Sequence, residues 1–304
     1  MSNHLEILRQ NGKSFYWAGK LLPKKYFVRC AELYSFCRLL DDIADTNTKD
    51  ENFIKLNFIL DLIKKNDYQK LEENNVYVPS YLKNCELAKS KIIDLIHGLI
   101  FDQKLVRIKS EEQLILYCYR VAGTVGVLMC IALECKDKNS FNFAIDLGIA
   151  MQLTNILRDI EEDSKLNRRY LPGKFINELT PKEILILTKD HDHSNHLILK
   201  DAIKKILLIS DLYYRSGNKG LVFLNFKFRI AIGIASNIYR EIGVKLKKNK
   251  FIWYKGRIYT TNFEKLKLTL KSLTNIFVFF KFKFPKHDHT CLLYTSDAAD
   301  DIPG

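Results

Sequence analysis

The chain is 304 residues long, enough for one large domain or two ordinary ones and ample to bury a core. Hydrophobic residues make up 47% and charged residues 27%, the balance of a folded soluble protein, which excludes general disorder, a collagen-like fibre and a disulfide-held miniprotein. The net charge is +13, and the segment 241–290 carries 12 Lys and Arg against 3 Asp and Glu. Such a basic excess suits nucleic acid, anionic lipid or a polyphosphate substrate, or else reflects a Lys-rich composition alone.

Every element that the sequence predicts is a helix. Gly and Pro number only 13 and 6, and this scarcity of turn residues favours long helices over a sheet. Apolar residues at helical spacing predict helices over 24–45, 50–66, 82–107, 111–134, 139–164, 198–215 and 227–248. Thr180, followed by Pro181 and Glu183, is typical of a helix start. The sequence therefore predicts an all-α fold without internal repeats or a domain linker.

The chain changes character at its end. Residues 291–304 are acidic and small, after a basic and aromatic segment, and are typical of a non-native or disordered tail. We therefore predict one helical domain over 1–290 and exclude the tail, 291–304, from the fold. Its Asp297, Asp300 and Asp301 resemble a metal-binding motif, but they lie in this excluded tail and we do not assign them to a metal site.

The cysteines and the N-terminal residues indicate the cellular compartment of the protein. The seven Cys are scattered and contain no CxxC pair, so neither a zinc ribbon nor a disulfide framework is expected. The first residues lack the apolar core of a signal peptide, and the longest apolar run, 125–133, is far short of the ~20 residues that span a bilayer. These features predict a cytoplasmic protein.

Two acidic motifs indicate metal chemistry. Asp41 and Asp45 lie four residues apart and would share a helix face. Asn155, Asp159 and Asp163 repeat that spacing. All five offer hard oxygen ligands, which suit Mg²⁺ with room for substrate phosphate oxygens.

The alternative for each motif is a solvated acidic helix face. Against it, both motifs lie in strongly apolar helices, where an unpartnered carboxylate pair is costly, and each adjoins an arginine, Arg38 or Arg158. Two such motifs on facing helices could hold a diphosphate through metal ions. If these residues bind metal, Asp41→Asn or Asp159→Asn should abolish turnover and leave the melting temperature nearly unchanged or raised. A raised melting temperature would fit relief of carboxylate repulsion.

Four blocks of the sequence resemble the phytoene/squalene synthase family. They are SFYWAGKLLPKKYFVRCAELYSFCRLLDDIAD (14–45), YCYRVAGTVG (117–126), GIAMQLTNILRDIEEDSKLNRRYLP (148–172) and GLVFLNFKFRIAIGIASNIYREIGVKL (220–246). The blocks occur in the order of that family and cover most of residues 14–260.

The resemblance implies an isoprenoid synthase fold, a single helical bundle around a central apolar cavity. It implies head-to-head condensation of two prenyl diphosphates through a cyclopropyl diphosphate. By motif, the metal ligands would be Asp41, Asp45, Asn155, Asp159 and Asp163. Arg38 would bind phosphate and Tyr117 would lie near the departing diphosphate. Further pocket positions would be Ser14, Phe15, Tyr34, Gln152, Arg169, Tyr239 and Arg257.

A dry pocket is the second requirement of this chemistry, because water would quench a carbocation. The apolar segment 111–134 offers Val121 and Ala122 for its wall. Gly123 and Gly126 would leave space beside the chain for substrate or let helices pack tightly, and these two alternatives are compatible.

The function predicted from these features is a Mg²⁺-dependent phytoene synthase that joins two geranylgeranyl diphosphates, with Mn²⁺ as an alternative metal. No GxGxxG fingerprint is present, and no NADPH is expected. The main alternative is a presqualene diphosphate or squalene-type synthase that uses farnesyl diphosphate. A catalytically silent homologue and a nucleic-acid-binding protein are less favoured, because both acidic motifs are intact and no basic stripe with exposed aromatics is seen.

The segment 277–284 combines Phe and Lys, and with the surrounding basic residues it could rest on anionic lipid at the inner face of the membrane. Its alternative is a poorly ordered tail. Expected partners are thus prenyl diphosphates and a membrane surface, with no nucleic acid.

Overall fold

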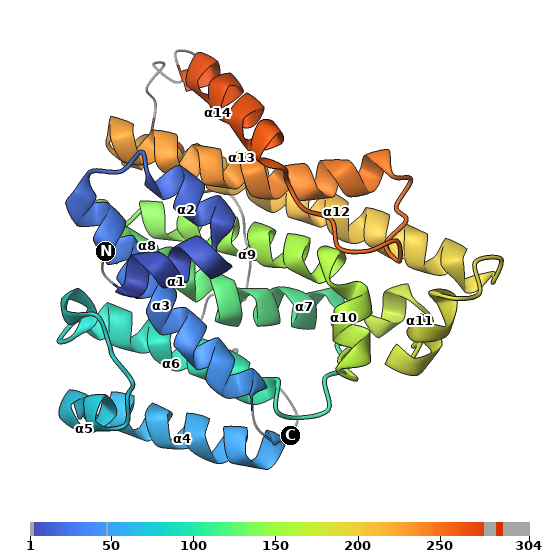
Figure 1. The fold of residues 1–304 in the computed structure, drawn as a ribbon, viewed down its shortest axis with the longest axis horizontal. Coiled ribbons are helices and arrows are strands. Elements are labelled where there is room, and N and C mark those ends of the chain that lie inside the picture. The colour runs from blue at the N-terminus through green and yellow to red at the C-terminus, as the bar shows by residue number, and fades with distance from the viewer. Residues whose placement is uncertain (1–2, 47, 277–283, 288–304) are drawn as a thin grey trace.

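The computed structural model describes residues 3–46, 48–276 and 284–287, and every regular element in those ranges is a helix (Figure 1). Within the same ranges the one β interaction is an isolated bridge between Arg107 and Arg169. The prediction of an all-α fold is therefore confirmed. The expected tail, 291–304, with its three aspartates, and most of the Phe-Lys segment, 277–283, lie outside the described residues.

The helices follow one another with short connections. In chain order they are α1 (Asn3–Asn11), α2 (Lys13–Gly19), α3 (Lys24–Asp45), α4 (Lys49–Lys65), α5 (Tyr68–Glu73), η1 (Ser80–Leu82), α6 (Glu86–Phe101), α7 (Glu111–Cys118), η2 (Tyr119–Gly123), α8 (Thr124–Ala132), α9 (Ser140–Arg158), α10 (Ile160–Lys165), η3 (Gly173–Phe175), α11 (Pro181–Leu187), α12 (Asn195–Lys219), η4 (Gly220–Phe223), α13 (Phe226–Lys248) and α14 (Asn262–Ile276).

Local sequence explains several boundaries. α3 covers the predicted 24–45. α11 begins with a capping box: the Thr180 hydroxyl accepts from the Glu183 backbone N–H at 3.3 Å, and the Glu183 carboxylate accepts from the Thr180 N–H at 2.7 Å. The same device starts α4, with Thr48 and Glu51. These boxes satisfy donors that a helix start leaves free.

Three predicted helices are shorter, divided or interrupted, among them 111–134, which contains η2 between α7 and α8. The range 82–107 contains only α6 as a helix, because Asn84 before it takes positive φ (59°) and Ile108 beyond it pairs its N–H with the Arg169 carbonyl at 3.1 Å. The range 139–164 divides at Asp159, whose φ and ψ of −108° and 18° lie outside helical geometry. Helices α1, α2, α5 and α14 fall outside the predicted ranges.

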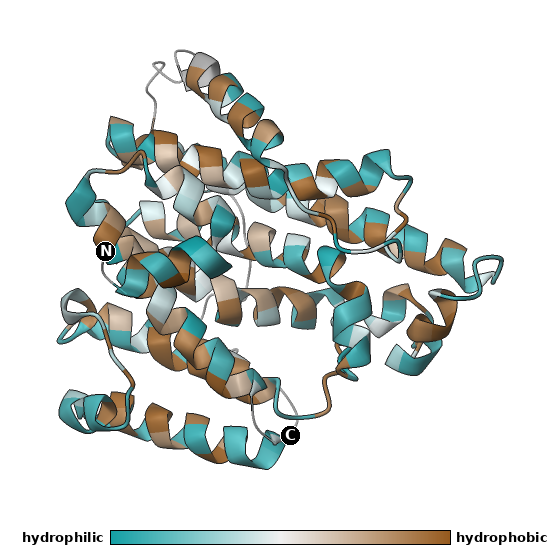
Figure 2. Cartoon of the chain, in the orientation of Figure 1, coloured by the Kyte–Doolittle hydropathy of each residue, from teal (hydrophilic) through white to brown (hydrophobic). Residues whose placement is uncertain are grey.

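The helices stack in layers, with α9 at the centre (Figure 1). α9 packs on α8, α12 and α13; α6 packs on α8 and α4; and α14 covers α13. One core cluster lies around α7, α9 and α12, and a second lies among α3, α4, α6 and α8. Figure 2 shows brown, apolar faces on these helices and teal, polar residues concentrated towards exposed ends and loops.

Two glycines bring helix backbones into contact. A Cβ on Gly126 would lie 2.2 Å from the Ala144 carbonyl oxygen, and one on Gly148 would lie 2.3 Å from the Ala122 carbonyl oxygen. Gly126 thus allows tight packing of α8 on α9, and it also lines a cavity, so both interpretations of this glycine hold. Gly123 is close-packed as well, because a Cβ added there would lie 3.1 Å from the side chain of Ile145.

The continuous segment Glu111–Ala132 is long and apolar enough to cross a membrane by length and composition alone. A search for uninterrupted apolar runs misses this segment, because polar residues occur within it. In the fold, 61% of its most apolar window is buried inside the protein, as in the core helix of a soluble protein. Its apolar character is accounted for by this packing.

Candidate active site

A cavity of about 350 Å³ lies between α2, α3, α8, α9 and α13. Its wall is largely aliphatic and aromatic, with contributions from Leu33, Met129 and Leu147. Of the residues that the sequence placed in the site, the wall contains Phe15, Tyr34, Asp41, Val121, Ala122, Gly126, Gln152, Asn155 and Tyr239. Segments that are distant in the sequence therefore converge on one apolar chamber with a few polar groups.

A π-turn positions part of this wall. Residues Tyr119–Gly123 wind as η2, with the Thr124 N–H bonded to the Tyr119 carbonyl five residues back. Such wide turns insert one residue into an α-helix and occur frequently at functional sites. Val121 and Ala122, within the turn, both line the cavity. The apolar pattern of this segment does not indicate the irregularity.

Three aromatic rings gather at the cavity. Phe15 of α2 stacks on Tyr239 of α13 with ring centroids 5.0 Å apart, and lies 6.3 Å from the ring of Tyr34. Burial raises the pKa of Tyr34 to about 12, so its phenol stays neutral. Aromatic faces carry negative charge density and can stabilise a cation without reacting with it.

Carboxylates from distant segments meet beside the cavity. Burial raises the pKa of Asp41 to about 7; Arg38 opposes this effect, while Asp45 and Asp102 add to it. Burial likewise raises the pKa of Asp163 to about 8, and the charges of Asp159 and Asp102 contribute. Both predicted acidic motifs therefore lie near Asp102, and one residue of each, Asp41 and Asn155, lines the cavity.

The break at Asp159 leaves its motif connected. The Asp159 N–H donates to the Asn155 carbonyl at 2.9 Å, and the Asp163 N–H donates to the Asp159 carbonyl at 2.8 Å. The three side chains thus stay one turn apart, although α9 and α10 are separate helices.

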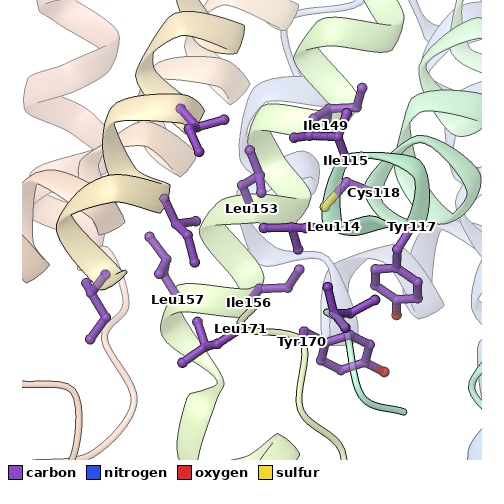
Figure 3. Packing of buried hydrophobic residues seen from close by; sticks show 14 of the residues in the cluster. Leu114, Ile115, Tyr117, Cys118, Ile149, Leu153, Ile156, Leu157, Tyr170 and Leu171 are labelled. Carbon is purple, nitrogen blue, oxygen red and sulfur yellow. The ribbon is translucent and has the colours of Figure 1, made fainter. Parts of the chain in front are cut away.

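Asp102 is a buried acid that the sequence motifs do not include. It accepts hydrogen bonds from Tyr117 at 2.9 Å and from Tyr170 at 2.8 Å, and the two rings stack 4.7 Å apart at the edge of an aliphatic cluster (Figure 3). Burial raises the pKa of Asp102 to about 6, against the lowering effects of Arg168 and the two phenols. Asp102 directly follows α6 and is not part of a repeated acidic motif, so the spacing of acidic residues in the sequence does not identify it. Tyr117 thereby lies beside the carboxylates and outside the cavity wall.

Arginines surround these acids. Arg158 and Arg257 both pair with Asp159, at 2.5 and 2.9 Å. Arg168 contacts Asp45 at 3.1 Å. Positive groups thus lie next to the carboxylates, as binding of a polyanion requires.

Two predicted site residues, Arg169 and Ser14, lie outside the cavity wall, and a third, Arg38, stays close enough to Asp41 to oppose the rise in its pKa. Arg169 bonds to Glu178 at 2.9 Å and to the carbonyl of Ile108 at 3.2 Å, in contacts that hold the chain beyond α10, while its neighbour Arg168 faces the acids. Arg38 pairs with Asp42 at 2.6 Å. Ser14 is half-buried on α2 and does not line the cavity wall.

The donor set fits a divalent metal of the magnesium kind. The Asn155 side-chain oxygen is buried without a hydrogen-bond partner, although its amide nitrogen donates to Gln152 at 3.2 Å. Burial and neighbouring acids disfavour the charged forms of Asp41 and Asp163, as their raised pKa values indicate, and a bound cation would relieve this. No group of three or more His, Cys, Asp or Glu side chains in the described ranges is close enough to form a metal cage. Mg²⁺ commonly relies on one or two carboxylates plus substrate phosphates.

Comparison with known proteins agrees with this geometry. The sequence model of the squalene/phytoene synthase family matches residues 8–264. The 15-cis-phytoene synthase of Pantoea ananas is 30% identical over 281 residues, covering 88% of this chain and 89% of the relative. The 4,4'-diapophytoene synthase of Staphylococcus haemolyticus is 27% identical, covering 86% and 92%.

Solved structures share the fold. A dehydrosqualene synthase crystallised with a ligand superposes with a TM-score of 0.74 at 24% identity, covering 91% of this chain and 96% of the other. A squalene synthase from Alicyclobacillus acidocaldarius gives a TM-score of 0.66 at 18% identity, covering 82% and 94%. At these identities the likeness establishes the isoprenoid synthase fold that the sequence resemblance implied.

Proposed function

This chain belongs to the squalene/phytoene synthase family of prenyltransferases, and on that premise we propose that it joins two molecules of geranylgeranyl diphosphate head to head and converts the resulting cyclopropyl diphosphate to phytoene. The observation that carries the proposal is the apolar cavity whose wall includes Asp41 and Asn155, one residue from each acidic motif. Relatives named phytoene synthase favour the longer substrate.

One set of site residues would neutralise the charge of the diphosphate, and another would shield the carbocation from water. Asp41, Asp45, Asn155, Asp159 and Asp163 would hold Mg²⁺. When bound, the metal supplies neutralisation of the diphosphate leaving group.

The protein's own cations act on the same group. Arg158, Arg168 and Arg257, now paired with acids, would turn to the diphosphate oxygens. Tyr117, held by Asp102, would orient its phenol towards the departing group. The rings of Phe15, Tyr34 and Tyr239 would stabilise the carbocation in a chamber that excludes water.

A second candidate is dehydrosqualene or squalene-type synthesis from farnesyl diphosphate. The observation in its favour is the 4,4'-diapophytoene synthase relative, which covers as much of the chain as the phytoene synthases do. The same site residues would serve either substrate, so only the product distinguishes the two.

The deciding experiment is a product assay. Purified protein would receive Mg²⁺ with geranylgeranyl or farnesyl diphosphate, with and without NADPH, and extracted hydrocarbons would be identified by mass. Phytoene from geranylgeranyl diphosphate, indifferent to NADPH, supports the proposal. A product from farnesyl diphosphate alone would support the second candidate function. If the folded protein makes no product from either substrate, both proposed functions are refuted.

We further propose that the protein is cytoplasmic and rests on the inner face of the membrane through α14. This helix exposes an apolar stripe of Phe263, Leu266 and Leu270, and Lys267 and Lys271 are exposed beside it. An amphipathic helix with basic flanks suits an anionic bilayer surface. α14 is attached to the fold by polar contacts, such as the Trp17 indole donating to Thr269 at 3.1 Å.

Vesicle sedimentation tests this contact. The parent protein should bind anionic vesicles and not zwitterionic ones. The Phe263→Ser, Leu270→Ser double variant should bind the anionic vesicles much more weakly. Leu105→Ser, at a site 66% exposed outside α14, is the matched control and should bind as the parent does. Equal binding by both variants would exclude α14 as the contact.

A further inference from the structure

The end of α8 is a Schellman turn that brings two cysteines together. The Cys135 N–H donates to the Cys130 carbonyl at 2.9 Å, and the Glu134 N–H donates to the Ile131 carbonyl at 3.0 Å. Glu134 takes the left-handed conformation (φ 55°) that this motif requires. The motif characteristically places the side chains of its first and last residues in contact, and here both are cysteines.

The two thiols share one polar neighbour. The Ser140 hydroxyl, at the start of α9, lies 3.2 Å from the Cys135 sulfur and 3.9 Å from the Cys130 sulfur. The Cys130 thiol also bonds to the Cys135 sulfur; this bond lowers the pKa of Cys135 to about 6 and raises that of Cys130. Cys135 is partly exposed and Cys130 is buried. The pair thus joins an accessible thiolate to a buried thiol.

The turn that holds the pair is itself fixed. Glu134 is not a glycine, so its positive φ needs support from its surroundings. Its carboxylate accepts from Lys25 and Tyr26, both at 2.8 Å, and pairs with Arg29, all from α3. These contacts fix the turn that joins the two cysteines.

We propose that Cys130 and Cys135 are a redox modification site that closes to an intrachain disulfide by exchange with a low-molecular-weight disulfide such as oxidised glutathione. The Cys135 thiolate attacks one glutathione sulfur, forming a mixed disulfide and releasing one glutathione thiolate. Cys130 then gives up its proton and attacks the Cys135 sulfur, expelling the second thiolate. Two protein thiols are oxidised, and one glutathione disulfide is reduced to two glutathione thiols.

The other cysteines in the described ranges lack this arrangement. Cys118 is fully buried, and burial raises its pKa. The Cys30 thiol contacts the Met129 thioether at 3.4 Å, and burial raises its pKa to about 12. Cys85 is half-buried and serves as an internal comparison. The proposal does not depend on which prenyl substrate the enzyme takes.

Mass spectrometry of the folded protein tests the proposal. The background would be Cys291→Ser, because Cys291 lies outside the described residues. Trypsin releases Cys130 and Cys135 together in one fragment, 121–136. After treatment with oxidised glutathione at pH 7, that fragment should lack two hydrogens and resist alkylation, and a dithiol reductant should reverse both changes.

Variants separate the two roles. Cys130→Ser should stop at a glutathione adduct on Cys135, Cys135→Ser should leave the fragment unmodified, and the control Cys85→Ser should behave as the parent. In the parent, alkylation of Cys135 should rise with pH around a midpoint of about 6.

A fragment that stays fully alkylatable after oxidation would overturn the proposal, as would a bond from either cysteine to a third one. The parent fragment alone decides the matter if a variant does not fold.

Discussion

Replacing Asp163 by Asn should stabilise the metal-free protein. The pKa of this carboxyl rises from 3.8 to about 8 on folding, so the folded protein keeps its proton while the unfolded chain has released it. Stability is therefore lost as the pH rises from about 4 to about 8. The upper limit of that loss is roughly 6 kcal/mol at 1.36 kcal/mol per pKa unit, and relaxation of the site reduces it to about 1–3 kcal/mol.

Asn carries no such proton, so Asp163→Asn should escape the loss. The melting temperature should exceed that of the parent by about 3–6 °C at pH 8.5, and the difference should vanish near pH 4. Melts would be recorded in EDTA by circular dichroism across this range. A variant that melts with the parent, or below it, at pH 8.5 would refute the reasoning.

Asp159→Asn is the matched control, and the structure reverses the expectation from sequence for this residue. Asp159 pairs with Arg158 and Arg257, so its removal leaves a mostly buried guanidinium without its partner. We expect a loss of about 1–3 kcal/mol in place of a gain. Both variants should lose turnover, which separates the shared catalytic role from the opposite effects on stability.

Three further outcomes are expected. Tyr117→Phe should lower kcat about 10-fold or more with little change in KM, because its phenol contacts Asp102; an unchanged kcat in a steady-state assay would remove it from the site. Arg168→Ala should weaken diphosphate binding in a KM measurement, whereas Arg169→Ala should chiefly lower the melting temperature; the reverse result would restore Arg169 as a substrate contact. Gly126→Ala should cost at least about 2 kcal/mol in urea unfolding, because its Cβ would lie 2.2 Å from a backbone oxygen; a neutral result would mean that α8 and α9 can separate there.

Most of the long helices and both acidic motifs are predictable from the sequence because they depend on local periodicity and spacing, whereas α1, α2, α5 and α14 are not predicted. Asp102 could not be predicted in this way, since its role depends on Tyr117 and Tyr170, which reach it from separate segments. The distinction between Arg168 and Arg169 depends on the direction of the chain after α10, which adjacent residues of one type cannot reveal.

Irregular backbone is equally hidden from the sequence. A π-turn at Tyr119–Gly123 and a break at Asp159 interrupt segments whose apolar pattern is that of a uniform helix. In both cases tertiary packing selects a geometry that propensity does not distinguish from an α-helix.

The π-turn also sets the angular phase of everything that follows it in α8. One inserted residue rotates the rest of a helix by about 100° about its axis. Because the wide turn absorbs the additional residue, this rotation is largely avoided, and Gly126 meets the Ala144 carbonyl while Cys130 lines the cavity. If the same sequence wound as an uninterrupted α-helix, both residues would turn away from these neighbours. The orientation of α8 relative to α9 therefore depends on the one additional residue that the π-turn accommodates between α7 and α8.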